Sequence, residues 1–165
     1  MNLWGIDLGG TKIECAVLDA NNHFNPIIRR RIATEAYKGY KHILSQINKL
    51  VDEVANETGL HPTKIGFATP GALEPDTQLM KNCNTVCMNG QAMKFDLENL
   101  LQAEVKIAND ANSFALAEAL MGAGKNHPDA EVVFGVIMGT GVGGGLVVHG
   151  KIINGRQSLG GEWGD

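Results

Sequence analysis

Two glycine-rich segments, each following a short apolar run, most constrain how this chain can fold. The first, residues 7–12, lies between apolar runs at residues 3–8 and 13–18. The second, residues 139–145, follows the apolar run 132–138. Short apolar runs bounded by glycine are typical of strands, so each segment is predicted to join two strands. The 21 glycines have no period and come with only five prolines, which excludes collagen and low-complexity linkers.

The rest of the chain alternates between strand and helix patterns. The first three apolar runs, ending with residues 27–32, predict a three-strand meander. From residue 39 to 57, apolar side chains recur every three or four positions, as on one face of an amphipathic helix. Further strands are expected at 64–68, 105–108, 132–138, 146–148 and 151–153, and further helices at 95–103 and 111–121. Strands that alternate with helices predict an α/β fold.

The stretch 122–130, which contains glycines and a proline, is the candidate boundary between two lobes. A chain of 165 residues fits one domain, or one domain and part of a second. The expected organisation is therefore an N-terminal lobe at 1–121 followed by the start of an incomplete C-terminal lobe at 122–165.

Charge, cysteine content and hydropathy exclude several classes of function. A net charge of −4 gives no basic surface for nucleic acid or an anionic membrane, so neither is expected as a partner. Neither a signal peptide nor an apolar run of about 20 residues is present, which favours a cytoplasmic protein. The three cysteines, Cys15, Cys83 and Cys87, have neither disulfide-framework nor zinc-site spacing, so no zinc is expected.

The first glycine-rich turn has the residues of a phosphate-binding loop. Gly9 and Gly10 let backbone N–H groups approach phosphate oxygens closely, while Thr11 adds a hydroxyl and Lys12 a positive charge. Asp7, at the strand end, is placed to hold Mg²⁺ directly or through water. The spacing is not that of a P-loop. An ordinary tight hairpin, in which Asp7 accepts turn hydrogen bonds, explains these residues equally well.

The second glycine-rich turn also matches a dinucleotide fingerprint, since Gly139, Gly141 and Gly144 fit G-x-G-x-x-G and Glu162 follows 23 residues after Gly139. That fingerprint must open a helix, whereas here the glycines lead into the strand-like residues 146–148. An NAD site is therefore rejected. Two glycine-rich turns on either side of a lobe boundary instead indicate a nucleotide phosphate tail bound between two lobes.

Together these motifs resemble those of the ROK family (repressors, open reading frames and sugar kinases), within the actin-like ATPase superfamily. The two glycine-rich turns look like the first and second phosphate motifs of the family. The remaining motifs are matched in order by Pro70-Gly71, residues 82–84, 89–91 and 107–112, and Gly161-Glu162-Trp163-Gly164. The match covers essentially the whole chain, and motifs in family order are far more specific than any one of them.

The resemblance implies an actin-like ATPase (ribonuclease H-like) fold, with ATP, Mg²⁺ and a hexose as ligands, in a homodimer. Asp110 would be the catalytic base that takes the proton from a sugar hydroxyl. Asn84, Asn109 and Glu162 would bind sugar hydroxyls, and the Pro70-Gly71 turn would let the backbone approach the ring. The nucleotide phosphates would be bound by Asp7, Gly9, Gly10, Thr11, Lys12, Gly139, Thr140 and Gly141. As residue types, Asn109 and Asp110 are also explained as the N-cap of the next helix, and the two roles can coexist.

The leading interpretation is therefore ATP-dependent phosphorylation of a hexose of the fructose, glucose or mannose type. A second is a sugar-responsive transcriptional regulator of the same family that lacks its DNA-binding domain, because only six residues precede Asp7. A third is a non-catalytic sugar-binding fragment. In the family a histidine usually follows Gly-Glu-x-Gly and helps three later cysteines to hold zinc, whereas this chain has Asp165 at that position.

Overall fold

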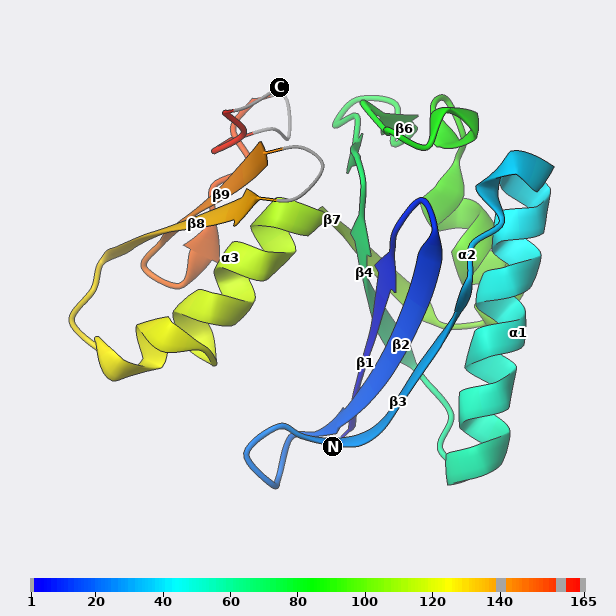
Figure 1. The fold of residues 1–165 in the computed structure, drawn as a ribbon, viewed down its shortest axis with the longest axis horizontal. Helices are drawn as coiled ribbons and strands as arrows, with labels where there is room; N and C mark the ends of the chain where they lie inside the picture. Colours follow the sequence, from blue (N-terminus) through cyan, green and yellow to red (C-terminus); the bar gives the residue numbers. More distant parts are fainter. Residues whose placement is uncertain (1, 139–141, 157–159, 164–165) are drawn as a thin grey trace.

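The computed structural model describes residues 2–138, 142–156 and 160–163. Its larger sheet has the strand order β3-β2-β1-β4-β7 (Figure 1). The strands are β1 (Asn2–Leu8), β2 (Lys12–Asp19), β3 (Asn25–Ala33), β4 (Lys64–Thr69) and β7 (Glu104–Asn109). β2 is antiparallel to β1 and β3, whereas β1, β4 and β7 are parallel to one another. The predicted three-strand meander and α/β class are both confirmed.

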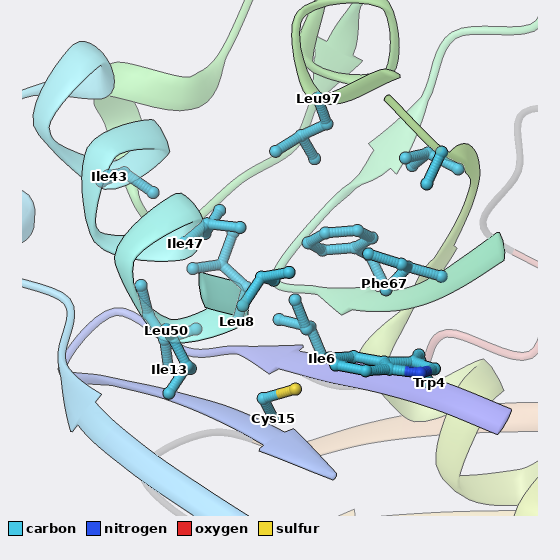
Figure 2. Close-up of a cluster of buried hydrophobic side chains, with 14 of the residues drawn as sticks. Trp4, Ile6, Leu8, Ile13, Cys15, Ile43, Ile47, Leu50, Phe67 and Leu97 are labelled. Carbon is cyan, nitrogen blue, oxygen red and sulfur yellow. The ribbon is translucent and has the colours of Figure 1, made fainter. Parts of the chain in front are cut away.

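One face of the larger sheet is covered by α1 (Tyr40–Thr58) and α2 (Met93–Leu101) (Figure 1). Alternate side chains of each strand point to this face, where they meet the apolar stripe of α1. Figure 2 shows Ile6, Leu8 and Ile13 of the sheet in one cluster with Ile47 and Leu50 of the helix. None of these five side chains is more than 2% exposed, so this cluster is the main core of the described chain.

The opposite face of the larger sheet carries small side chains. Gly5 of β1 lies beside Gly66 of β4 and opposite Ala16 of β2. A Cβ placed on Gly5 would meet no atom of the described residues within 4 Å. This face borders an open cavity of about 410 Å³, whose lining also includes Asp7 and Glu14. The small residues therefore leave room next to two carboxylates.

A second, smaller sheet packs against α3 (Asp110–Leu120), which follows β7 without a loop. The sheet is antiparallel, in the order β10-β9-β8, and consists of β8 (Val132–Met138), β9 (Val142–Val148) and β10 (Lys151–Ile152). A Cβ placed on Gly145 would lie 2.5 Å from the carbonyl oxygen of Ala111, and one on Gly135 would lie 2.7 Å from Ala115 Cβ. Glycine at these two positions is what allows the helix to approach the sheet.

β8 lies at the edge of the smaller sheet as far as the described residues form it. Four apolar side chains alternate along its face away from α3, and all four are exposed: Val132, Phe134, Val136 and Met138. The strand contains neither a charged residue nor a proline. One edge strand of the larger sheet differs, because β3 carries Pro26 and three consecutive arginines, residues 29–31.

The structure corrects the sequence analysis at the second glycine-rich segment. Residues 143–145 lie inside β9, not in a turn before it, and the strand begins four residues earlier than predicted. The physical reason is close packing on both faces, since Gly145 meets α3 and a Cβ on Gly144 would lie 2.7 Å from Trp163. The sequence pattern predicts a turn at these glycines, whereas their lack of a side chain lets β9 pack closely on both faces.

Most other elements are where the sequence predicts them, and each helix begins within two residues of its expected start. The pattern does not predict the short elements, which are β5 (Ala72–Leu73), β6 (Met80–Lys81) and the 3₁₀ turns η1 (Ala36–Lys38), η2 (Val86–Met88) and η3 (Ala123–Asn126). The lobe boundary at 122–130 stays a prediction. No helix in the described part of the chain is long and apolar enough to cross a membrane.

The three cysteines are expected to differ sharply in reactivity. Cys15 and Cys83 are buried, and burial raises the pKa of the Cys15 thiol to about 12 and that of Cys83 to about 11. Only Cys87 is partly exposed. Since the thiolate is the reactive form, iodoacetamide at pH 8 should modify Cys87 alone in the folded chain and all three thiols in guanidinium. Peptide mass spectrometry would measure this, and early modification of Cys15 would contradict the fold.

Candidate functional site

Residues predicted for the site, from the ends of three parallel strands, meet at one edge of the larger sheet. Asp7 lies near the end of β1, and Asn109 and Asp110 lie where β7 passes into α3. Pro70 and Gly71 follow β4, whose last residue pairs in register with Asn109. Ligands of open α/β sheets bind outside the carboxyl ends of the parallel strands. This edge, which is the upper one in Figure 1, is therefore the candidate site.

The turn between β1 and β2 is fixed by hydrogen bonds within the turn and from Thr34. The N–H of Gly9 donates to the carbonyl of Lys12 at 2.9 Å, which closes the turn. Thr34, which is fully buried, donates its hydroxyl to the carbonyl of Gly9 at 2.7 Å and its N–H to that of Thr11 at 3.0 Å. The tip residue, Gly10, is exposed. A fixed turn with an exposed glycine tip suits the binding of phosphate by backbone N–H groups.

The hairpin interpretation requires Asp7 to accept hydrogen bonds from the turn, and the described part of the structure shows none. The turn bonds are made by the backbone and Thr34, and within the described residues the Asp7 carboxylate accepts no hydrogen bond. The pKa of Asp7 is raised, first by burial and then by the negative charge of Asp110. Burial also raises the pKa of Asp110. Two partly desolvated carboxylates whose negative charges repel favour the binding of a proton or a cation between them.

Glu14, directly opposite Asp7 on β2, has a different electrostatic setting. Burial alone would raise the pKa of Glu14, but hydrogen bonds from Arg29 and Arg31 of β3 outweigh it and lower that pKa. The charge of Glu14 is thus balanced within the sheet. Asp7 is consequently the better candidate to face a bound cation.

The strand-to-helix junction fixes Asn109 and Asp110. Asn109 is the N-cap of α3, and its side-chain oxygen accepts a hydrogen bond from the N–H of Asn112 at 3.2 Å. The capping interpretation is therefore confirmed for Asn109, whose amide nitrogen is the donor left for a ligand. Asp110 is the first helical residue and is open to solvent, although its carboxylate is partly desolvated, and it accepts from the N–H of Ala111 at 2.8 Å. No side chain of the described residues donates a hydrogen bond to its carboxylate.

The loop 82–89 lies beside the other strand ends. Gly71 is buried against it, since a Cβ there would lie 2.5 Å from the carbonyl oxygen of Lys81 and would clash with Cys83. The side chain of Asn89 accepts from the N–H of Cys83 at 2.8 Å and donates to its carbonyl at 3.1 Å, which braces the loop. Asn84, predicted to bind sugar, is exposed next to this brace.

Glu162 comes to the same region from the end of the chain. The point where a Cβ on Gly143 would lie is 3.4 Å from a Glu162 carboxylate oxygen and 3.6 Å from Ala111 Cβ. The exposed Glu162 side chain therefore lies near Ala111 in the first turn of α3. Gly139, Thr140 and Gly141, predicted to bind phosphate, lie outside the described residues. The other predicted site residues all fall at or next to this edge.

The carboxylates at this edge fit the magnesium ion that the resemblance implies. Mg²⁺ is commonly held by one or two carboxylates together with substrate phosphates and water. Asp7 and Asp110 supply carboxylates next to a turn suited to phosphate. Across the described ranges, no three His, Cys, Asp or Glu side chains gather into a site made of protein alone. Nucleotide phosphates would therefore have to complete the coordination.

Comparisons with known proteins agree with this architecture. The family model described as the ROK family matches residues 3–165. An N-acetyl-D-glucosamine kinase from Pectobacterium atrosepticum is 37% identical over 161 residues, which is 98% of this chain and 51% of that protein. The chain thus spans about half the length of the curated relatives it matches.

Solved structures show the same fold. A ROK hexokinase from Thermus thermophilus superimposes with a TM-score of 0.81 at 28% identity, covering 98% of this chain and 52% of the other. A ROK family glucokinase from Streptomyces griseus, solved with glucose and AMPPNP, superimposes with a TM-score of 0.83 at 24% identity, covering 98% and 49%. The predicted actin-like ATPase fold is confirmed. With a family match over nearly its whole length, the chain belongs to the ROK family.

Proposed function

We propose that this chain is the N-terminal part of an ATP-dependent hexose kinase, with a sugar of the fructose, glucose or mannose type as its substrate. The supporting observation is that the β1–β2 turn, Asp7 and the Asn109-Asp110 junction lie at one strand-end edge. A turn suited to phosphate beside a carboxylate that can accept a proton fits phosphoryl transfer to a hydroxyl.

In the proposed reaction, Asp110 accepts the proton of the attacking sugar hydroxyl while that oxygen bonds to the γ-phosphorus of ATP and ADP leaves. The free oxygen of the Asp110 carboxylate is the acceptor, because the other oxygen is bonded to the N–H of Ala111. Asn109 donates its amide to a sugar hydroxyl, and Asn84 and Glu162 bind further hydroxyls. The close approach of the Pro70-Gly71 backbone excludes water from one side of the ring.

On the nucleotide side, the exposed backbone of Gly10, the Thr11 hydroxyl and the Lys12 ammonium would bind the phosphates. Gly9, whose own N–H and carbonyl hold the turn, would let the phosphates come close because it has no side chain. Gly139, Thr140 and Gly141 are proposed to bind them from the second lobe. Asp7 would hold Mg²⁺, with Asp110 close by. When bound, the ion would neutralise charge that develops on the phosphates. Transfer of this kind depends on positioning more than on covalent chemistry, which fits residues held by strand ends.

The sugar and the catalytic competence of the chain can be tested together. ADP release from Mg·ATP would be followed with fructose, glucose, mannose and N-acetylglucosamine, and sugar binding by calorimetry. Turnover with one hexose supports the proposal. Binding without turnover supports a sugar-binding fragment or the sensing half of a regulator. The absence of both binding and turnover overturns the proposal. Light scattering in the same buffers would test the proposed homodimer.

A further inference from the structure

Thr85 points its hydroxyl at the tip of the β1–β2 turn. A Cβ placed on Gly10 would lie 3.3 Å from Thr85 Oγ1, and no other atom of the described residues outside the immediate neighbours of Gly10 comes within 4 Å of that position. Thr85 follows Asn84 in the loop 82–89. The candidate sugar loop and the candidate phosphate turn therefore meet at this hydroxyl.

The hydroxyl of Thr85 has no structural task among the described residues. Thr85 precedes η2, yet its side chain does not cap that turn, and only its backbone carbonyl is used, accepting from the N–H of Met88 at 3.0 Å. The side chain is half-buried. A hydroxyl is both donor and acceptor, and in such a position it normally has a partner. The Thr85 hydroxyl is therefore free to hydrogen-bond to a ligand that reaches the turn.

The position of Thr85 is fixed by the loop around it. Asn89 holds both backbone polar groups of Cys83 through its side chain, and Cys83 in turn packs against buried Gly71. On the other side, Thr34 holds the β1–β2 turn. Because both elements are anchored independently, the close approach of Thr85 to Gly10 is a defined feature of the fold. A ligand oxygen bound at the exposed Gly10 tip would lie near the Thr85 hydroxyl.

We propose that Thr85 is a further phosphate-binding residue, whose hydroxyl donates a hydrogen bond to the terminal phosphate of a nucleoside triphosphate held at Gly10. This rests on the proposed function. Through this bond the loop that carries Asn84 contacts the nucleotide only when the terminal phosphate is present. A nucleoside diphosphate, which lacks that group, makes no contact with Thr85.

The test compares two nucleotides on the same variants. Calorimetry would measure binding of the Mg²⁺ complexes of the β,γ-imido analogue of ATP and of ADP to the 165-residue chain. Thr85→Val removes the donor at nearly constant shape and should weaken the analogue about tenfold, the size expected for one hydrogen bond to a charged group, and leave ADP within about twofold. Thr85→Ser keeps the donor and should bind both like the wild type.

Val86→Ala is the matched control, since Val86 is the exposed neighbour in the same loop and should change neither affinity. Thr85→Ala, with a smaller side chain, should repeat the pattern of Thr85→Val. Equal weakening of both nucleotides would show that Thr85 only shapes the turn and would overturn the inference, as would unchanged binding of the analogue. If the wild-type chain binds neither nucleotide, the proposed function fails first and this inference fails with it.

Discussion

Asp110→Asn is expected to lower kcat of the sugar-dependent ADP release by a factor of about 10²–10⁴, the range for loss of a general base. The substituted side chain keeps the shape and the oxygen that accepts from the N–H of Ala111, so α3 should start as before. What disappears is the carboxylate oxygen that takes the proton. Sugar affinity, measured by calorimetry, should therefore stay within about threefold while turnover collapses.

Asp129→Asn is the control for this substitution, because Asp129 is exposed in the 122–130 stretch, away from the strand ends. It should leave turnover unchanged. A kcat of Asp110→Asn close to the wild-type value would remove Asp110 as the base. A joint loss of sugar binding and turnover would instead assign it to substrate positioning.

The same substitution should stabilise the fold at neutral pH. Burial raises the pKa of Asp110 in the folded chain above its unfolded value. The stability that this group contributes is therefore fully present below the unfolded pKa, about 3.9, and is lost as the pH rises through the folded pKa. At pH 7 the neutral asparagine avoids this loss, so thermal melts should show a higher Tm. A lower Tm at pH 7 would contradict the raised pKa of this carboxyl.

Leu50→Ala is expected to lower the free energy of unfolding by about 2–5 kcal/mol, the range for removing a large buried aliphatic side chain. Leu50 is fully buried where α1 lies on the sheet, and its neighbours in the cluster come from β1 and β2 (Figure 2). These neighbours are fixed in strands and can only partly collapse into the space. Urea unfolding followed by circular dichroism would measure the difference.

Lys49→Ala provides the comparison on the same helix, one position earlier. Its side chain is 61% exposed and makes at most a weak pair with Glu53, so it should change stability by less than about 0.5 kcal/mol. If Leu50→Ala were equally harmless, α1 would not cover the sheet in solution. Because the core lies on the face away from the cavity, ligand affinity measured well below the unfolding transition should change little.

The elements that follow a simple hydrophobic period could be predicted from the sequence. α1 repeats its apolar residues at helical spacing and ends at Gly59, whose φ of 70° is the left-handed conformation that glycine adopts readily. The meander likewise follows from short apolar runs and a glycine pair. In these segments the conformational preference of the residues and the burial of their apolar side chains favour the same structure. The local sequence pattern is therefore enough to predict it.

Contacts between segments distant in sequence could not be predicted in this way. Thr34 lies at the end of β3 and supports the β1–β2 turn, yet nothing in its local sequence signals a buried threonine. Thr85 meets Gly10 across 75 residues, a contact that only the assembled loops create. Gly145 was assigned to a turn by its residue type, whereas its role is set by the Ala111 backbone. Tertiary packing decides these positions.

Among the described residues the edge of β8 is unpaired, which has a consequence for how this chain refolds on its own. Strands with alternating apolar residues and no charge or proline add readily to other strands, and natural proteins usually block such edges, as the arginines of β3 do here. During refolding, β8 of one molecule competes for the exposed β8 of another. The rate of intermolecular pairing rises with protein concentration, whereas the rate of intramolecular folding does not. Dilution therefore favours folding over association.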